Sequence, residues 1–314
     1  GALMTMPPTE QVTGQQSGIT WDLHQADYER AGLRLHYLDA RRASASPGRR
    51  AAVLLHGMTS HGDSWRPVIS RMVHTERVIC PDFRGHGFSD WTRDGYWLKD
   101  YATDVLALID RLDLTEVDLL GHSLGARVSM VLAPMLGDRL RSWIISDTGP
   151  EVSRAAAQQA LSINASAKSV PGFRDIEKLK DFLRSEQPLW VEEAIELRAQ
   201  KLYRENWVGM LVNRGDTEVT WLLGRPGLVE KDDMWAGLRN TNVPTLILKA
   251  NNSFLLDDEL TSRMLEALAR GAARRFDVGH YLPYEDPDGV TAAIDEFFHE
   301  PAATVSSLTP KPTE

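Results

Sequence analysis

The chain has 314 residues, and its 35 Lys and Arg against 44 Asp and Glu give a formal net charge of −9. This balance argues against a nucleic-acid partner, which requires clustered positive charge. The single cysteine, Cys80, excludes an internal disulfide. No run of about 18 apolar residues predicts a membrane helix, and no secretory segment precedes Arg30, so we expect a cytoplasmic protein without a membrane partner.

The order of predicted elements indicates an α/β fold. Residues 18–40 contain two alternating apolar–polar stretches around Ala31-Gly32, which predicts a β-hairpin. Short apolar runs then alternate with segments of helical periodicity. The runs predict strands at 51–55, 78–80, 117–120, 142–145, 245–248 and 274–278, and the periodic segments predict helices at 64–74, 98–112, 124–136, 257–270 and 289–298. We therefore expect a mostly parallel, eight-stranded sheet with helices on both faces.

Three segments interrupt this alternation. Residues 150–240 contain no run typical of a buried strand, which predicts a helical insert between two core segments, 18–149 and 241–300. The polar segments 1–17 and 301–314 are expected to be disordered. The chain thus consists of one α/β domain with one insert.

The sequence Gly121-His122-Ser123-Leu124-Gly125 lies between a predicted strand and a predicted helix. This is the context that a G-x-S-x-G nucleophile elbow requires, since small residues must flank so tight a turn. The N-terminus of the helix also favours a developing negative charge. The pattern indicates that Ser123 is a nucleophile; the alternative is a Gly/Ser turn without chemistry.

With three further motifs, the chain resembles the α/β-hydrolase superfamily over about residues 19–299. The motifs are His56-Gly57, the sequence P-D-F-R-G-H-G-F-S at 81–89, and Val278-Gly279-His280. The resemblance implies that Ser123 is the nucleophile and that His280 is its base. It implies an oxyanion hole formed by the backbone N–H groups of Met58 and Leu124, no cofactor, and a His122 side chain that points away from the nucleophile.

The resemblance leaves two candidates for the catalytic acid. Most members carry it after the seventh strand, where this chain has Ser253; Asp257 lies four residues later and is the alternative acid. Another subset, which includes one subgroup of haloalkane dehalogenases and the zearalenone lactonases, carries it after the sixth strand. Asp147 ends that strand here, and we predict that it is the acid; the alternative role for Asp147 is to cap the following turn.

The superfamily's cap lies over the active site, and residues 150–240 correspond to it. We expect an apolar or aromatic small-molecule substrate, held by aromatic side chains of the cap and of loops at the pocket mouth. The candidate pocket residues are His56, Trp65, Trp91, Arg127, Trp190, Tyr203, Trp207 and Trp221. His56 also has a structural alternative, and the tryptophans have the alternative of packing the cap onto the core. Arg127 either reaches a substrate carboxylate or bridges to the cap.

These expectations define a Ser-His-Asp hydrolase of a small-molecule ester or lactone. Amide hydrolysis, C–C bond hydrolysis of a β-diketone, and a non-catalytic ligand receptor are the alternatives. Residues 56–60, 121–127 and 147–148 resemble the bacterial hydrolases of 2-(acetamidomethylene)succinate, which cleave an amide. The nearest cluster of metal-binding residue types, His56, His61 and Asp63, lacks the spacing of a metal site, so no metal is expected.

Overall fold

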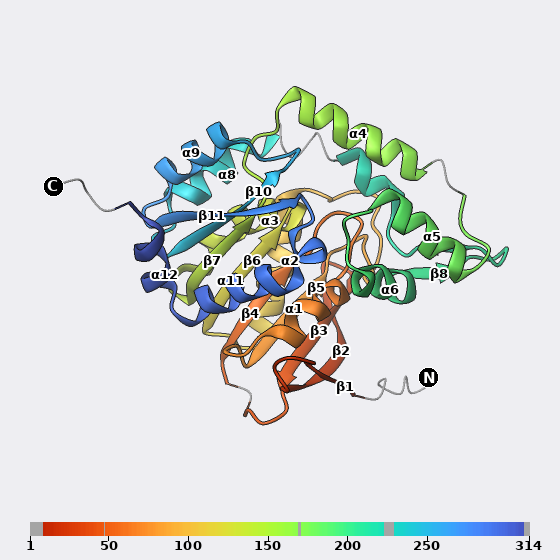
Figure 1. Ribbon diagram of the computed structural model, residues 1–314, viewed down its shortest axis with the longest axis horizontal. Helices are drawn as coiled ribbons and strands as arrows, with labels where there is room; N and C mark the ends of the chain where they lie inside the picture. Colours follow the sequence, from red (N-terminus) through yellow and green to blue (C-terminus); the bar gives the residue numbers. More distant parts are fainter. Residues whose placement is uncertain (1–8, 47, 169–170, 223–228, 311–314) are drawn as a thin grey trace.

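The computed structural model describes residues 9–46, 48–168, 171–222 and 229–310. One nine-stranded sheet runs through the molecule in the order β1-β2-β3-β5-β4-β6-β7-β10-β11 (Figure 1). Its strands are β1 (Glu10–Thr13), β2 (Thr20–Arg30), β3 (Leu33–Arg42), β4 (Arg50–Leu55), β5 (Arg77–Asp82), β6 (Glu116–His122), β7 (Leu140–Ser146), β10 (Thr245–Asn252) and β11 (Gly271–Gly279). The pairs from β5 to β11 are parallel, whereas β1, β2 and β3 pair antiparallel. The predicted α/β fold is confirmed.

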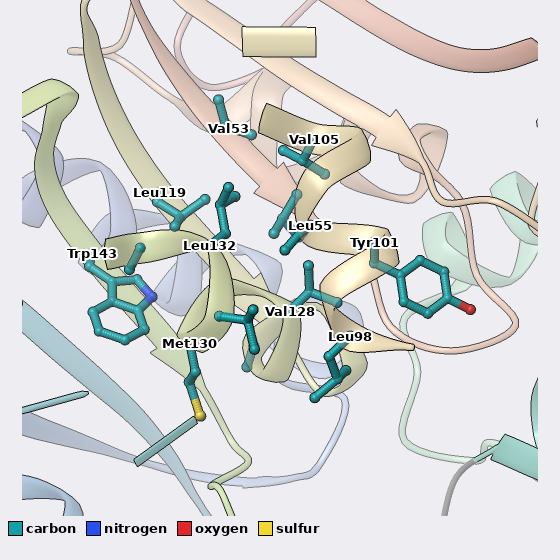
Figure 2. Close-up of a cluster of buried hydrophobic side chains, with 14 of the residues drawn as sticks. Val53, Leu55, Leu98, Tyr101, Val105, Leu119, Val128, Met130, Leu132 and Trp143 are labelled. Atoms are coloured by element: carbon teal, nitrogen blue, oxygen red, sulfur yellow. The ribbon is translucent and has the colours of Figure 1, made fainter. Parts of the chain in front are cut away.

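The sheet is buried on both faces, which explains the continuous apolar runs of its central strands. Successive residues of a strand point to opposite faces. In β4, Val53 and Leu55 belong to one buried cluster, and Ala52 and Leu54 belong to the other. Figure 2 shows the first cluster, in which strand residues pack against side chains of α2 (Leu98–Arg111) and α3 (Leu124–Leu136).

Helices cover both faces. The face with α2 and α3 also carries α8 (Lys231–Arg239) and α9 (Asp258–Ala267), whose apolar side chains join the same cluster. The opposite face is covered by α1 (Arg66–Arg71), α11 (Pro287–His299) and α12 (Pro301–Leu308). The short α10 (Leu282–Glu285) precedes α11, and 3-10 turns form η1 (Gly62–Trp65) and η2 (Gly137–Arg139).

The insert follows β7. It contains α4 (Arg154–Lys168), α5 (Ile176–Glu186), α6 (Glu192–Lys201), β8 (Tyr203–Glu205), β9 (Leu211–Asn213), η3 (Thr217–Leu222) and α8. In Figure 1, α4 lies at the top of the view and α5 and α6 on the right, whereas α12 lies on the left. The insert is less uniformly helical than predicted, because β8 and β9 form an antiparallel pair. Its last helix, α8, packs on α3 and is part of the core cluster.

Both termini differ from the sequence-based expectation. Part of residues 1–17 forms the edge strand β1, which pairs with β2 from Glu10 opposite Leu23 to Thr13 opposite Thr20. The sheet therefore has nine strands instead of eight. At the other end, α12 forms within 301–314, with Pro301 in its first turn and Val305 buried against the core. For the described residues 9–17 and 301–310 the predicted disorder is wrong, because tertiary contacts order β1 and α12; the rest of both stretches lies outside the described residues.

Candidate active site

Ser123 occupies a strained turn between β6 and α3. Its φ of 56° lies in the left-handed region, which is costly for a residue with a side chain. A Cβ on Gly121 would overlap the carbonyl oxygen of Gly125, and a Cβ on Gly125 would overlap that of Leu55. The close approach of these backbones requires glycine on both sides, as the elbow pattern predicts.

A hydrogen-bonded relay connects Ser123 to a buried carboxylate. His280, directly after β11, places Nε2 3.0 Å from Ser123 Oγ and Nδ1 2.8 Å from Asp147 Oδ2. Asp147 is fully buried at the end of β7, and its Oδ1 accepts a hydrogen bond from the backbone N–H of Ala250 at 2.8 Å. The structure therefore brings together the three residues that the sequence analysis selected.

Asp147 owes its position to a backbone turn at the end of its strand. Its φ is 54°, and its N–H donates to the carbonyl of Leu248 at 2.8 Å. The alternative acid, Asp257, has a different role, because its Oδ1 accepts from the Leu260 N–H at 2.7 Å and caps α9. Ser253, at the usual position of the acid, accepts hydrogen bonds from the N–H groups of Leu255 and Leu256.

The two residues predicted to form the oxyanion hole lie in segments next to Ser123. Leu124 is the first residue of α3, and the N–H groups of a first helical turn have no acceptor within the helix. The loop that carries Met58 passes close to the serine, since a Cβ on Gly57 would lie 3.5 Å from the Cβ of Ser123. Leu124 follows the serine directly, and Met58 belongs to a separate segment whose preceding residue, Gly57, approaches the serine.

Two further histidines, His56 and His122, lie beside the site. His56 is fully buried, with Nδ1 2.6 Å from the Gly57 carbonyl and Nε2 accepting from the Phe83 N–H at 3.1 Å. Both nitrogens are used, and burial holds the pKa of His56 well below its usual value. It ties two loops together, and its place among the pocket residues is wrong.

The ring of His122 packs against His280. Its ring centroid lies 4.9 Å from that of His280, and its Nδ1 lies 2.9 Å from Ser146 Oγ. Burial, and secondarily the neighbouring His280, lowers the pKa of His122 well below its usual value. A neutral imidazole therefore packs against the ring of His280.

The predicted aromatic pocket is mostly not formed by the tryptophans. Trp65 is 3% exposed and belongs to the core, whereas Trp207 is 96% exposed. Trp91 is half-exposed, and its Nε1 donates to the carbonyl of Arg214 in the insert. Tyr203 and Trp190 pack on the small apolar cluster of the insert, and Trp190 also lines a small cavity with Ser60, His61 and Tyr284. The side chain of Trp221 lies outside the described residues.

The aromatic rings that do contact His280 were missed in the sequence. Phe254 and Tyr281 place their ring centroids 4.9 Å and 5.1 Å from it. Tyr281 follows His280 directly, and Phe254 follows Ser253 in the loop after β10. Both residues lie next to positions that carry a base or an acid in related chains, and this adjacency could have identified them in the sequence.

Arg127 is buried in the first turn of α3, with 7% of its surface exposed. Burial lowers the pKa of its guanidinium to about 10. Within the described residues it has no ion pair and its side chain donates no hydrogen bond, so the expected bridge to the cap is not seen there.

Two features are absent from the described ranges. There, no three His, Cys, Asp or Glu side chains come together as metal ligands would. No helix in those ranges has the length and apolarity needed to span a membrane.

Comparisons with known proteins agree with this architecture. A 2-(acetamidomethylene)succinate hydrolase from Mesorhizobium japonicum is 29% identical over 253 residues, which cover 78% of this chain and 86% of that protein. A 3-hydroxybutyrate-oligomer hydrolase from Cupriavidus necator is 26% identical over 270 residues, covering 79% and 88%. A solved structure of an E-2-(acetamidomethylene)succinate hydrolase shares the fold, with a TM-score of 0.77 and 24% identity over 88% of this chain and 99% of that one. Residues 52–293 match the sequence model of the alpha/beta hydrolase family, and this chain therefore belongs to that family of hydrolases.

Proposed function

We propose that this protein is a serine hydrolase that cleaves a small-molecule carboxylic ester or lactone through an acyl-enzyme. The observation that carries the proposal is the relay from Ser123 Oγ through the two nitrogens of His280 to Asp147. A serine hydroxyl is a weak nucleophile near neutral pH and needs an adjacent base. His280 Nε2 is within hydrogen-bonding distance of it.

In the first half of the reaction, Ser123 Oγ attacks the carbonyl carbon and its proton passes to His280 Nε2. Asp147 accepts the hydrogen bond from Nδ1–H, which fixes the tautomer and stabilises the imidazolium. The N–H groups of Met58 and Leu124 hold the oxyanion. When the C–O bond to the leaving alcohol breaks, His280 returns the proton to that oxygen.

In the second half, a water molecule gives its proton to His280 Nε2 and attacks the acyl carbon. The bond to Ser123 Oγ then breaks, and the serine recovers the proton from His280. The products are an alcohol and a carboxylic acid. In a lactone, both groups remain on one molecule.

Residues 150–240 act as a cap in this proposal. Asn213 Nδ2 donates to the carbonyl of Thr59, next to Met58, at 3.2 Å. The Val191 N–H donates to the carbonyl of Tyr284, a few residues after His280, at 2.8 Å. The insert thus contacts the segments that carry both the proposed oxyanion donor and the proposed base.

Amide hydrolysis is the second candidate. It is favoured by the similarity to a 2-(acetamidomethylene)succinate hydrolase over most of both chains. The same relay would protonate a leaving nitrogen in place of an alkoxide. Matched ester and amide pairs with one acyl group would distinguish the two by kcat/KM.

The test combines hydrolysis of p-nitrophenyl acetate with labelling by a fluorophosphonate. Wild type is expected to hydrolyse the ester and to carry the label on Ser123, located by mass spectrometry. Ser123→Ala should lose both, and His280→Gln should lose at least about 10³-fold in kcat. The matched control is Ser307→Ala, since Ser307 lies on the exposed part of α12. Equal hydrolysis by wild type and Ser123→Ala would refute the proposal.

A further inference from the structure

Arg127 is a buried cation without a counterion in the described structure. Every Asp and Glu of the chain except Glu314 lies in the described residues, and none of these carboxylates pairs with Arg127. Two other buried arginines show the contrast. Arg77 pairs with Asp39 at 2.9 Å, and Arg84 pairs with Asp104 at 2.7 Å.

An unpaired charge in the interior is costly, because burial removes its hydration and supplies nothing in return. The lowered pKa of Arg127 has burial as its only cause, with no contribution from a neighbouring charge. Within the described residues, the fold therefore carries a destabilising group whose buried Nε has no hydrogen-bond partner and whose guanidinium has no ion pair. Such a group is retained at a cost to stability where function requires it.

The position of Arg127 connects this cation with the proposed nucleophile. Its backbone N–H donates to the Ser123 carbonyl at 3.2 Å, one turn into α3. Side chains of an α-helix lean toward its N-terminus, and Ser123 is the residue directly before the first residue of α3. The same helix end adds partial positive charge. Both effects favour an anion near the start of α3.

We propose that Arg127 binds a carboxylate of the substrate, separate from the carbonyl that Ser123 attacks. The guanidinium matches a carboxylate with two parallel hydrogen bonds, and the pair is strongest where water is excluded. The substrate class is therefore a half-ester, lactone or half-amide that retains one free carboxylate. This inference rests on the proposed function for its reacting bond but names a separate binding contact.

A binding experiment tests the contact without catalysis. Ser123→Ala would be heated with succinate, glutarate or adipate, and with glutaramide as the neutral comparison. At least one dicarboxylate is expected to raise the melting temperature, whereas glutaramide does not. The Ser123→Ala, Arg127→Met double variant should lose that shift. A shift that persists in the double variant, or no shift with any of the three dicarboxylates, would overturn the carboxylate contact.

A kinetic experiment uses two esters of matched shape, p-nitrophenyl hydrogen glutarate and p-nitrophenyl 5-methylhexanoate. Arg127→Met is expected to lower kcat/KM for the charged ester by about 10- to 100-fold and for the neutral ester by less than about threefold. For the charged ester, kcat/KM of Arg127→Lys should lie between those of wild type and Arg127→Met, because lysine keeps the positive charge but cannot form the two parallel hydrogen bonds. Arg49→Met, at an exposed pair with Asp113, is the matched control and should change neither.

The two proposals fail differently. If Ser123→Ala hydrolyses both esters like wild type, the serine mechanism fails while the dicarboxylate shift still decides the role of Arg127. If Arg127→Met slows both esters equally and melts well below wild type, Arg127 is structural and the inference fails. We expect its melting temperature to be no lower than that of wild type, because the substitution removes an unpaired buried charge.

Discussion

Asp147 and His280 meet at 2.8 Å although 133 positions separate them in the chain, and the whole insert lies between them. The second oxygen of Asp147 is held by Ala250, so the carboxylate cannot swing away from the imidazole. Asp147→Asn should keep this shape but favour the wrong tautomer of His280. We expect kcat to fall by about 10³- to 10⁴-fold with little change in melting temperature.

The control for this prediction is Asp257→Asn. Asparagine caps helices as well as aspartate does, so kcat and melting temperature should both stay close to wild type. Steady-state kinetics on a p-nitrophenyl ester measures both variants. A loss of kcat in Asp257→Asn but not in Asp147→Asn would show that the acid is Asp257, and our assignment of Asp147 would be wrong.

The glycines around Ser123 give a prediction about stability. Gly125→Ala should destabilise the protein by about 3 kcal/mol, because its Cβ would overlap the Leu55 carbonyl and backbone cannot move aside as a side chain can. Gly57→Ala meets Ser123 Cβ at 3.5 Å, an ordinary contact, and should melt like wild type while kcat/KM falls. Differential scanning calorimetry measures both variants. Equal melting temperatures for Gly125→Ala and Gly57→Ala would contradict this prediction.

The buried histidines give a prediction about pH. Burial lowers the pKa of His86 to about 4. Between pH 6.5 and about 4 the unfolded chain binds a proton at this residue and the folded protein does not. This histidine therefore makes the free energy of unfolding fall by about 1.4 kcal/mol for each unit that the pH drops in this window. Asp82, with its pKa raised by burial to about 6, opposes the trend, since the folded form takes up that proton first.

Comparing single variants isolates the contribution of His86 from the others. In urea titrations across this pH range, His86→Gln should show a shallower pH dependence than wild type by about one proton. Ser306→Ala, at an exposed position of α12 that does not titrate, is the control and should keep the wild-type slope. Parallel curves for His86→Gln and wild type would contradict the prediction.

The aromatic contacts of His280 give a prediction about substrates. Phe254→Ala removes a ring 4.9 Å from His280 and should lower kcat/KM by about tenfold, through lost packing of the imidazole and of the acyl group. Trp207→Ala changes a side chain that is 96% exposed and should leave kcat/KM and stability unchanged. A series of aliphatic and aromatic p-nitrophenyl esters is the measurement. A larger loss of kcat/KM for Trp207→Ala than for Phe254→Ala would contradict this prediction and support a pocket lined by tryptophans.

The parts of the fold that were predictable are those in which local pattern and tertiary burial agree. β4 is a continuous apolar run because both of its faces are covered, and Ser123 and Asp147 end strands that such runs identify. β1 has no such pattern, since its residues are mostly exposed and its order comes from pairing with β2. The predicted helix at 64–74 ends at Arg71, because the Asp295 carboxylate accepts the N–H groups of Val73, His74 and Thr75.

Residues of the site could be predicted from the sequence only where they lie directly at the end of a strand or a helix. The tryptophans were assigned to a pocket by composition and cap location, but burial depends on packing that one sequence does not specify. The lack of a carboxylate partner for Arg127 among the described residues could not be predicted either, because it depends on where every carboxylate of the fold lies. The sequence indicated that Arg127 had a partner, without indicating whether that partner was the cap or a ligand.

The loop between β10 and α9 contains no member of the proposed triad. Ser253 shapes it through two backbone hydrogen bonds, and Phe254 carries its contact to His280. In relatives that keep the acid there, every change in that loop risks moving a charge. In this chain the proposed acid, Asp147, is held one strand away, so a substitution in the loop leaves its hydrogen bonds to His280 and Ala250 in place. Substitutions at Phe254 can therefore change the surroundings of His280 without displacing the proposed acid.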